Sequence, residues 1–172
     1  GGYVQVDETP VRYLAPGHGK TRTGYFWTTS RPGGDAVYQW ETSRAAACLD
    51  KVLSVDFKGT VQCDGYAAYP SFARHKEHIQ LVACWAHARS KFFEAKEQDP
   101  VMAGWLLRQI GHLYRIEKKL RLSRSGPRLR HAVRAHQACS LLGDAQPIAL
   151  HSVMRMDAVM FASRHGAFLV VR

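Results

Sequence analysis

The first strand of the fold is encoded in YVQVDET, residues 3–9, where apolar and polar residues alternate up to an acid. This alternation places both valines on one face of a strand and Asp7 at its end. A second run, GTVQCDGY at residues 59–66, has the same form and carries Asp64 after its apolar residues. Carboxylates at the ends of two strands can hold catalytic metal ions, although a strand-end Asp more often only bonds its own loop.

Further strands and helices are indicated on both sides of these runs. Aromatic and β-branched residues predict strands, and residues 16–20 and 31–35 predict the turns that join the first three strands into an antiparallel meander. The apolar run at 79–84 is typical of a buried parallel strand. The strands are expected at 3–13, 25–29, 36–40, 59–64 and 79–84, and the helices at 44–55, 69–75, 88–98 and 101–122. This order describes an α/β protein with a mixed sheet flanked by helices and matches the ribonuclease-H-like fold.

The composition limits the function. The 172 residues suffice for a domain with a hydrophobic core, and the net charge of +10 favours a polyanionic partner such as nucleic acid. No apolar run approaches the length of a membrane span, and no secretion signal precedes the first strand. We therefore expect a cytoplasmic protein with reduced thiols and no membrane partner. The chain begins without Met, which suggests a fragment of a longer protein.

The two aspartates suit a divalent cation. Phosphoryl transfer at paired metal ions uses carboxylates, and Mg²⁺ or Mn²⁺ prefers these hard oxygen ligands together with water and substrate phosphates. Asp7 and Asp64 would supply two carboxylates from neighbouring strands. Glu8 follows Asp7 directly and is expected to point to the opposite face of the strand.

Five motifs in order give the chain a family resemblance. They are VDETPV (6–11), PGHGKTRTGYFW (16–27), CDGYAAY (63–69), CWAHARSKFFE (84–94) and IGHLYRIE (110–117). Together they closely resemble the catalytic core of transposases of the insertion-sequence 66 family over residues 1–122. The resemblance implies a DNA transposase that cleaves DNA and transfers strands through an Asp-Asp-Glu triad, with DNA ends and target DNA as partners. Asp7 matches the first acid and Asp64 the second.

The third acid of that triad is not found. The resemblance implies a Glu on a downstream helix, yet no Glu follows Glu117. Glu94 and Glu117 are the candidate substitutes, although helical Glu is more often solvated surface. We therefore expect a truncated copy of a transposase core with little or no activity of its own. The alternatives are an inactive DNA-binding module, a non-functional pseudogene product, or a small nuclease that uses Glu94 or Glu117.

Basic residues mark candidate DNA contacts. His18, Lys20 and Arg22 lie in a glycine-flanked loop between the first two strands, where a solvated hairpin is an equal alternative. Arg89 and Lys91 follow the fifth strand at the start of a helix.

His87 is an auxiliary candidate in the same segment. Cys84 and His87 have the spacing of half a zinc site, but a buried Cys with a positioning His is the commoner arrangement. Within the resemblance, His87 is a motif residue near the active site. The oligomeric state, including a homo-oligomer, is left open by the sequence.

The segment 123–172 differs in composition from the rest. It has no Lys and no Glu but seven Arg and four His. We interpret it as a basic, poorly patterned tail, and we hypothesise that it results from translation in a shifted reading frame. A helix at 132–142 and a strand at 161–171 are its only candidate elements.

Overall fold

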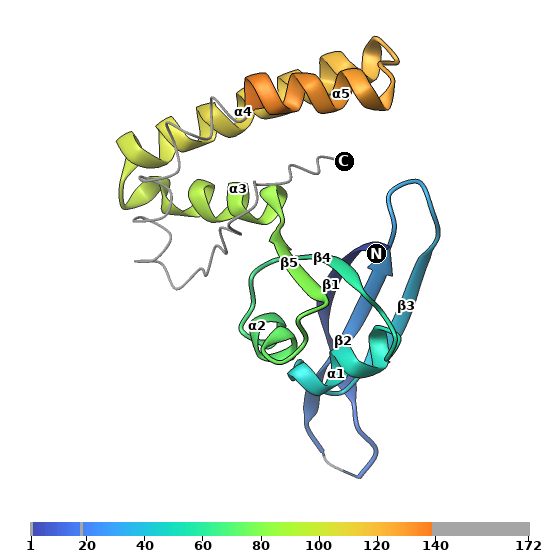
Figure 1. Cartoon of the computed structure of the whole chain (residues 1–172). Coiled ribbons are helices and arrows are strands. Elements are labelled where there is room, and N and C mark those ends of the chain that lie inside the picture. Colours follow the sequence, from blue (N-terminus) through green and yellow to red (C-terminus); the bar gives the residue numbers. More distant parts are fainter. Residues whose placement is uncertain (1, 18, 139–172) are drawn as a thin grey trace. The chain divides into compact units, whose positions relative to one another are not determined.

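The computed structural model describes residues 2–17 and 19–138, and it shows the predicted mixed α/β architecture (Figure 1). The chain divides into two compact units, residues 1–83 and 84–172. The first unit holds the sheet and two short helices, and the described part of the second unit is helical. The predicted division at residue 122 stays a prediction, since most of the tail lies outside the described residues.

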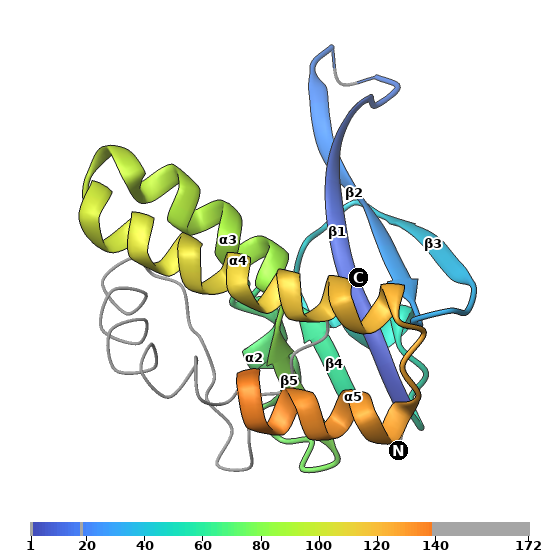
Figure 2. The same ribbon diagram turned by 90° about the horizontal axis from the view of Figure 1, so that it is seen from above.

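The first unit is built on a five-stranded sheet in the order β3-β2-β1-β4-β5. β1 pairs with β2 and β2 with β3 in antiparallel fashion, which confirms the predicted meander. β4 pairs in parallel with both β1 and β5. The bounds are β1 Gly2–Leu14, β2 Thr21–Ser30, β3 Ala36–Glu41, β4 Gly59–Cys63 and β5 Ile79–Ala83. Figure 2 shows the β1–β2 hairpin projecting beyond the other strands.

One face of this sheet carries the hydrophobic core. The alternation in β1 sends Val4 and Val6 into it, where they meet Val61 and Cys63 of β4 and Trp27 of β2. The helices α1 (Ala46–Val52) and α2 (Ala68–Ala73) cover this face with Leu49, Tyr69 and Phe72, and Leu53, directly after α1, joins the same core. Because Val6 faces the core, Asp7 must point to the opposite face of β1 and Glu8 to the core side.

The prediction that the fifth strand is buried was wrong. β5 is half-buried along its whole length, because it lies at the edge of the sheet and pairs with β4 alone. Its parallel direction was predicted correctly. The continuous apolar run thus indicated a parallel strand but not its position in the sheet.

The described part of the second unit consists of helices. They are α3 (Trp85–Glu94), the short 3₁₀ helix η1 (Ala95–Glu97), α4 (Pro100–Leu122), α5 (Pro127–Val133) and the π-helical segment η2 (Arg134–Ala138). α4 begins where the Asp99 side chain accepts a hydrogen bond from the Met102 amide, with Pro100 in the first turn. Leu106 and Ile110 of its predicted apolar stripe pack against Phe92 of α3.

Candidate active site

Asp7 lies on β1, and Asp64 directly follows the end of the neighbouring parallel strand β4. The β1–β4 ladder runs from the pair Gly2–Gly59 to the pair Gln5–Gln62. Each of its pairs joins residues 57 apart in sequence, and Asp7 and Asp64 have the same separation. Both therefore lie one pleat beyond Gln5 and Gln62, on the continuation of one register.

Asp7 lies on the face of the sheet opposite the core. It is exposed, whereas Val6 and Glu8 on either side of it are buried. Its Oδ1 accepts a hydrogen bond from the Glu8 amide at 3.1 Å. On the same face, Gln62 Oε1 accepts hydrogen bonds from the Gln5 side chain at 2.7 Å and from the Tyr3 hydroxyl. Asp7 thus follows a row of polar side chains that ties β1 to β4.

Asp64 is held by two hydrogen bonds at the end of β4. Its Oδ1 accepts from the Tyr66 amide at 2.8 Å, and its Oδ2 accepts from Arg44 Nη2 at 3.1 Å. The turn from Asp64 to Tyr66 needs glycine at position 65, because the φ of 88° there is unfavourable for residues with a side chain. The carboxylate remains partly accessible, with 21% of its side chain exposed. A local turn and one cation therefore set the orientation of Asp64.

The same cation reaches a second, buried acid. Arg44 Nε donates to Glu8 Oε1 at 2.5 Å, and the Glu8 side chain is fully buried. The Tyr69 hydroxyl donates to the other oxygen, Glu8 Oε2. Arg44 also lies over the Tyr66 ring, with its guanidinium carbon 3.7 Å from the ring centroid. Glu8 is thus neutralised and hydrogen-bonded on the core side, as a buried carboxylate requires.

Burial dominates the ionisation of this network. It raises the pKa of Glu8 above its usual value, and the negative charge of Asp64 acts in the same direction. The hydrogen bonds from Tyr69 and Arg44 lower the pKa and offset part of this effect. Burial, together with the Glu8 carboxylate, raises the pKa of Tyr69 far above its usual value. Tyr69 is therefore a permanent hydrogen-bond donor to Glu8.

The donor set fits a divalent cation in part. Two carboxylates on one register suit Mg²⁺ or Mn²⁺, which take their remaining ligands from water and substrate phosphates. Within residues 2–17 and 19–138, no group of three or more His, Cys, Asp or Glu side chains is placed to hold a metal ion. In this part of the chain the metal ligands expected from the sequence thus remain a pair of acids.

The three auxiliary candidates belong to the second unit. Glu94 is exposed at the end of α3 and pairs with Lys91, with 3.2 Å between Nζ and Oε2. Glu117 is buried, and Arg134 binds both of its oxygens, at 2.6 and 2.9 Å. His87 hydrogen-bonds Cys84 at the start of α3.

The Cys84–His87 pair changes the acidity of the thiol. Burial raises the pKa of Cys84, but the His87 imidazole and the backbone amides of Ala86 and His87 oppose it, so that the pKa falls below its usual value. Cys48 and Cys63 are buried, and within the described residues neither they nor Cys84 form a disulfide. Cys139 lies outside the described residues.

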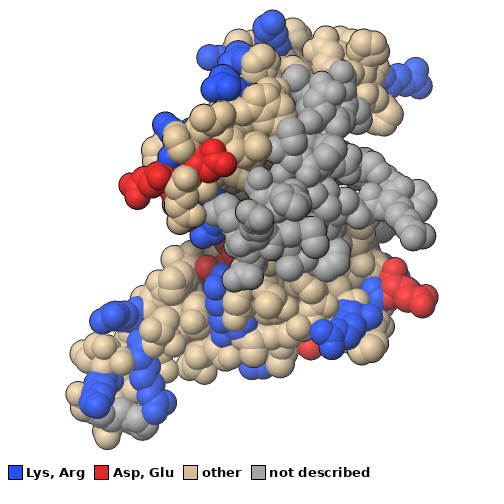
Figure 3. All heavy atoms as spheres, turned by 90° about the vertical axis from the view of Figure 1, so that its left-hand side faces the viewer, with Lys and Arg blue, Asp and Glu red and all other residues tan. Residues whose placement is uncertain are grey.

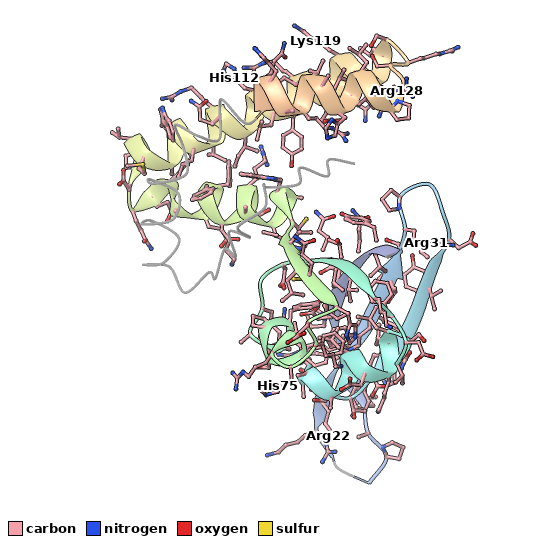
Figure 4. The ribbon with its side chains drawn as sticks, viewed as in Figure 1. Arg22, Arg31, His75, His112, Lys119 and Arg128 are labelled. Carbon is pink, nitrogen blue, oxygen red and sulfur yellow. The ribbon has the colours of Figure 1, made fainter. Side chains whose placement is uncertain are left out.

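The predicted DNA-binding residues lie on exposed surface. Lys20 and Arg22 are exposed in the β1–β2 hairpin, where Lys and Arg side chains gather at the projecting end (Figure 3). Arg22 lies near the start of β2 and Arg31 directly follows its other end (Figure 4). The stretch 9–34 contains no acid at all. Arg89 and Lys91 are exposed on α3, and His18 lies outside the described residues.

The sequence reasoning missed Arg44, Tyr66 and Tyr69 as parts of the site. Both tyrosines belong to the CDGYAAY motif, and their closeness to Asp64 along the chain could have indicated that they lie near it in the fold. Arg44 gave no such signal, because it precedes a short helix far from both acids in sequence. Glu8 was correctly expected on the face opposite Asp7.

Comparison with known proteins identifies the family. The model of the Transposase IS66 family matches residues 1–160. The chain belongs to this family of transposases. The match extends past residue 122, where the resemblance read from the sequence ends. The comparison with solved structures found no match for this transposase chain.

Two relatives of the transposase chain come from Sinorhizobium fredii (strain NBRC 101917 / NGR234). The uncharacterized protein y4qI is 39% identical over 108 residues, covering 55% of this chain and 20% of the relative. The uncharacterized protein y4jD is 32% identical over 132 residues, covering 69% of this chain and 26% of the relative. The chain thus spans only a small part of the length of these relatives. None of the helices in its described part is long and apolar enough to cross a membrane.

Proposed function

We propose that Asp7 and Asp64 are two ligands of a divalent-metal site at which the parent transposase cleaves DNA and transfers its strands. The observation that carries this proposal is the place of Asp7 on β1 and of Asp64 directly after β4, with Asp7 on the open face and Asp64 partly accessible. We also assign the sheet to the ribonuclease-H-like fold. The order β3-β2-β1-β4-β5, with a meander followed by two parallel strands, supports that assignment.

The chain's own residues would prepare this site before DNA arrives. When bound, Mg²⁺ or Mn²⁺ would activate the attacking oxygen and stabilise the leaving oxygen. Arg44 and the Tyr66 amide orient the Asp64 carboxylate, so that little side-chain freedom remains to be lost. Glu8 and Tyr69 in turn fix Arg44 from the buried side. Glu8 is thus a positioning residue rather than a ligand.

We further propose that this chain does not complete strand transfer alone. Among the described residues no third acid joins Asp7 and Asp64 in a group of three, and the candidate substitutes already hold other partners. Glu117 is buried in a two-point ion pair with the partly exposed Arg134, and turning its carboxylate toward a metal ion would break both of these charged hydrogen bonds. Glu94 pairs with Lys91 on an exposed helix. A third acid would have to come from outside residues 2–17 and 19–138, whether in the tail or in another part of the parent protein.

Metal binding tests the proposal directly. Calorimetric titration of the chain with Mn²⁺ should show binding that Asp7→Asn or Asp64→Asn weakens about tenfold or more, since each variant removes a charged ligand. Asp35→Asn is the matched control, because Asp35 is an exposed acid in the β2–β3 turn. Equal affinity in all four proteins would contradict the assignment. Efficient strand transfer by the chain, abolished by Asp7→Asn, would contradict the proposed inactivity.

An inactive DNA-binding module is the second candidate. The exposed cations of the β1–β2 hairpin and the absence of acids from residues 9–34 favour it. DNA affinity should then fall steeply with salt, because Lys20 and Arg22 would release counterions from phosphates. Lys20→Ala with Arg22→Ala should reduce the salt dependence by about two phosphate contacts. DNA binding of this kind without any Mn²⁺ binding would favour the module over the metal site.

A further inference from the structure

A cluster of aromatic side chains lies on the same face of the sheet as Asp7. Side chains alternate between faces along each strand, and the unbroken β1–β2 and β2–β3 registers carry this alternation across the meander. The face opposite the core receives Tyr13 from β1, Phe26 from β2, and Tyr38 and Trp40 from β3. We call these four residues the aromatic face.

Trp40 is the centre of this cluster. Its ring makes edge-to-face contacts with Tyr13, at 5.3 Å between centroids and 87° between planes, and with Phe26, at 5.0 Å and 65°. Gly24 makes room for it, because a Cβ at this position would lie 2.3 Å from the Trp40 ring. Rings fixed by one another and by the backbone lose little freedom when a flat ligand stacks on them.

Side chains of the aromatic face are exposed to solvent, unlike those of the hydrophobic core. Phe26 is 43% exposed, Trp40 37% and Tyr38 68%. The polar residues between them are Thr9 and Thr28, which pair with Phe26 and Asp7 respectively. The surface therefore alternates exposed rings with hydroxyl groups.

Its position relative to Asp7 follows from the register. Asp7 pairs with Thr28, and Thr28 pairs with Tyr38, so that Asp7 and Tyr38 belong to one row across the sheet. Phe26 and Trp40 belong to the next row on this face, displaced by two residues, or roughly 7 Å, along the strands. The rings thus lie within a nucleotide or two of the proposed metal ligand.

The charges around the aromatic face favour an anionic ligand. Arg22 pairs directly with Tyr13 on this face, and Lys20 lies in the same hairpin just before β2. Among the strand residues of β1, β2 and β3 that point to this face, Asp7 is the only acid. A ligand matched to flat rings bordered by cations is itself flat and anionic, as nucleotides are.

We propose that the aromatic face binds unpaired DNA by stacking its bases on Phe26, Tyr38 and Trp40, with Arg22 and Lys20 on its phosphates. This inference rests on the proposed function for its choice of DNA, and it adds a binding site for single-stranded DNA beside Asp7. Stacking ignores base identity, so the site holds a strand without reading its sequence. It keeps a frayed DNA end next to the acids.

Binding to short oligonucleotides in EDTA tests this site without metal or catalysis. The chain is titrated with a single strand, with the matching duplex, and with a strand of the same length whose central nucleotides are abasic. The abasic strand keeps every phosphate and lacks only the stacking bases. We expect the intact single strand to bind roughly five- to tenfold more tightly than the abasic one, as expected for loss of stacking.

Tyr38→Ala provides the decisive variant, with Val37→Ala as its matched control. The two residues are neighbours on β3 and similarly exposed, at 68% and 62%, but they point to opposite faces. Tyr38→Ala should reduce the preference for the intact strand, whereas Val37→Ala should leave it unchanged. Trp40→Phe keeps a ring and should retain part of the preference if folding is intact by circular dichroism.

Three results would overturn the inference. One is equal affinity for intact and abasic strands, which would leave a purely electrostatic surface. Another is a Tyr38→Ala variant with an unchanged preference. The third is a change from dimer to monomer in Tyr38→Ala by sedimentation, with DNA binding unaltered, which would assign the face to self-association. Because EDTA is present throughout, failure of the metal site proposed for Asp7 and Asp64 would not alter any of these readings.

Discussion

Glu8 binds Arg44 from inside the hydrophobic core, although Glu8 directly follows the exposed Asp7 in sequence. The Glu8 carboxylate is fully buried, and Arg44 Nε lies 2.5 Å from its Oε1. Nη2 of the same guanidinium group donates a hydrogen bond to Asp64 Oδ2 at 3.1 Å. β1 thus carries two neighbouring acids with different roles. Asp7 is exposed on the face opposite the core, and the buried Glu8 holds the arginine that orients Asp64.

Removal of Arg44 should be costly for stability. Arg44→Ala leaves Glu8 buried with only Tyr69 as partner, so we expect a loss of about 3–5 kcal/mol in the free energy of unfolding. Urea denaturation measures it. Lys51→Ala is the control, because its ion pair with Glu41 involves a mostly exposed lysine, and its loss should change the stability far less than Arg44→Ala does. Glu8→Gln placed on Arg44→Ala should recover part of the loss, and simple additivity of the two changes would contradict a direct coupling.

Glu117 should behave as a structural residue. Arg134 binds both of its oxygens in the second unit, but the Arg134 side chain is itself 35% exposed, so Glu117→Ala should lower the free energy of unfolding by only about 1–2 kcal/mol through loss of the charged hydrogen bonds. Mn²⁺ affinity, measured by calorimetry below the unfolding temperature, should stay the same in Glu117→Gln. Weaker Mn²⁺ binding in that variant would instead make Glu117 the third acid. Glu94→Gln serves as the exposed comparison.

Much of the fold followed from local patterns. The alternation in YVQVDET predicted the strand and the opposite faces of Asp7 and Glu8, because side chains alternate strictly along a strand. The apolar stripe of α4 placed Leu106 and Ile110 in a core correctly. These features depend only on neighbours in sequence.

The features that escaped prediction depend on tertiary contacts. Arg44 joins Glu8 and Asp64 across 36 and 20 residues of chain, and no periodicity encodes such a contact. The burial of Glu117 likewise needed the approach of Arg134, from a segment whose pattern predicted a later helix. The partial exposure of β5 reflects its edge position, which composition alone does not determine.

Gly24 should tolerate no side chain. A Cβ there would lie 2.3 Å from the Trp40 ring, so Gly24→Ala must displace the ring, and we expect a loss of about 1–3 kcal/mol in unfolding free energy. Gly104→Ala is the matched control within α4. Its Cβ would meet only Arg108 Nη1 at 3.6 Å, and better helix propensity should add about 0.5–1 kcal/mol. Equal effects of the two substitutions would show that the Trp40 ring does not pack as described.

Cys84 should be the most reactive of the described thiols. Its pKa lies below the usual value because the opposing effect of His87 and two backbone amides outweighs burial, so more thiolate is present at neutral pH than in an ordinary cysteine. The thiolate fraction, and with it the alkylation rate, should rise with pH and reach half its maximum below pH 9. Cys48 and Cys63 are buried and should react only on unfolding.

A His87 variant tests whether the imidazole causes the lowered pKa of Cys84. Iodoacetamide labelling followed by peptide mass analysis gives the rate at each cysteine across a pH series. His87→Ala removes the hydrogen bond to Cys84, so the midpoint of the Cys84 rate profile should move to higher pH while the plateau rate is kept. His112→Ala is the control, since His112 is exposed on α4 and is not among the groups that shift the pKa of Cys84. An unchanged midpoint in His87→Ala would assign the acidity of Cys84 to the backbone amides at the start of α3 instead.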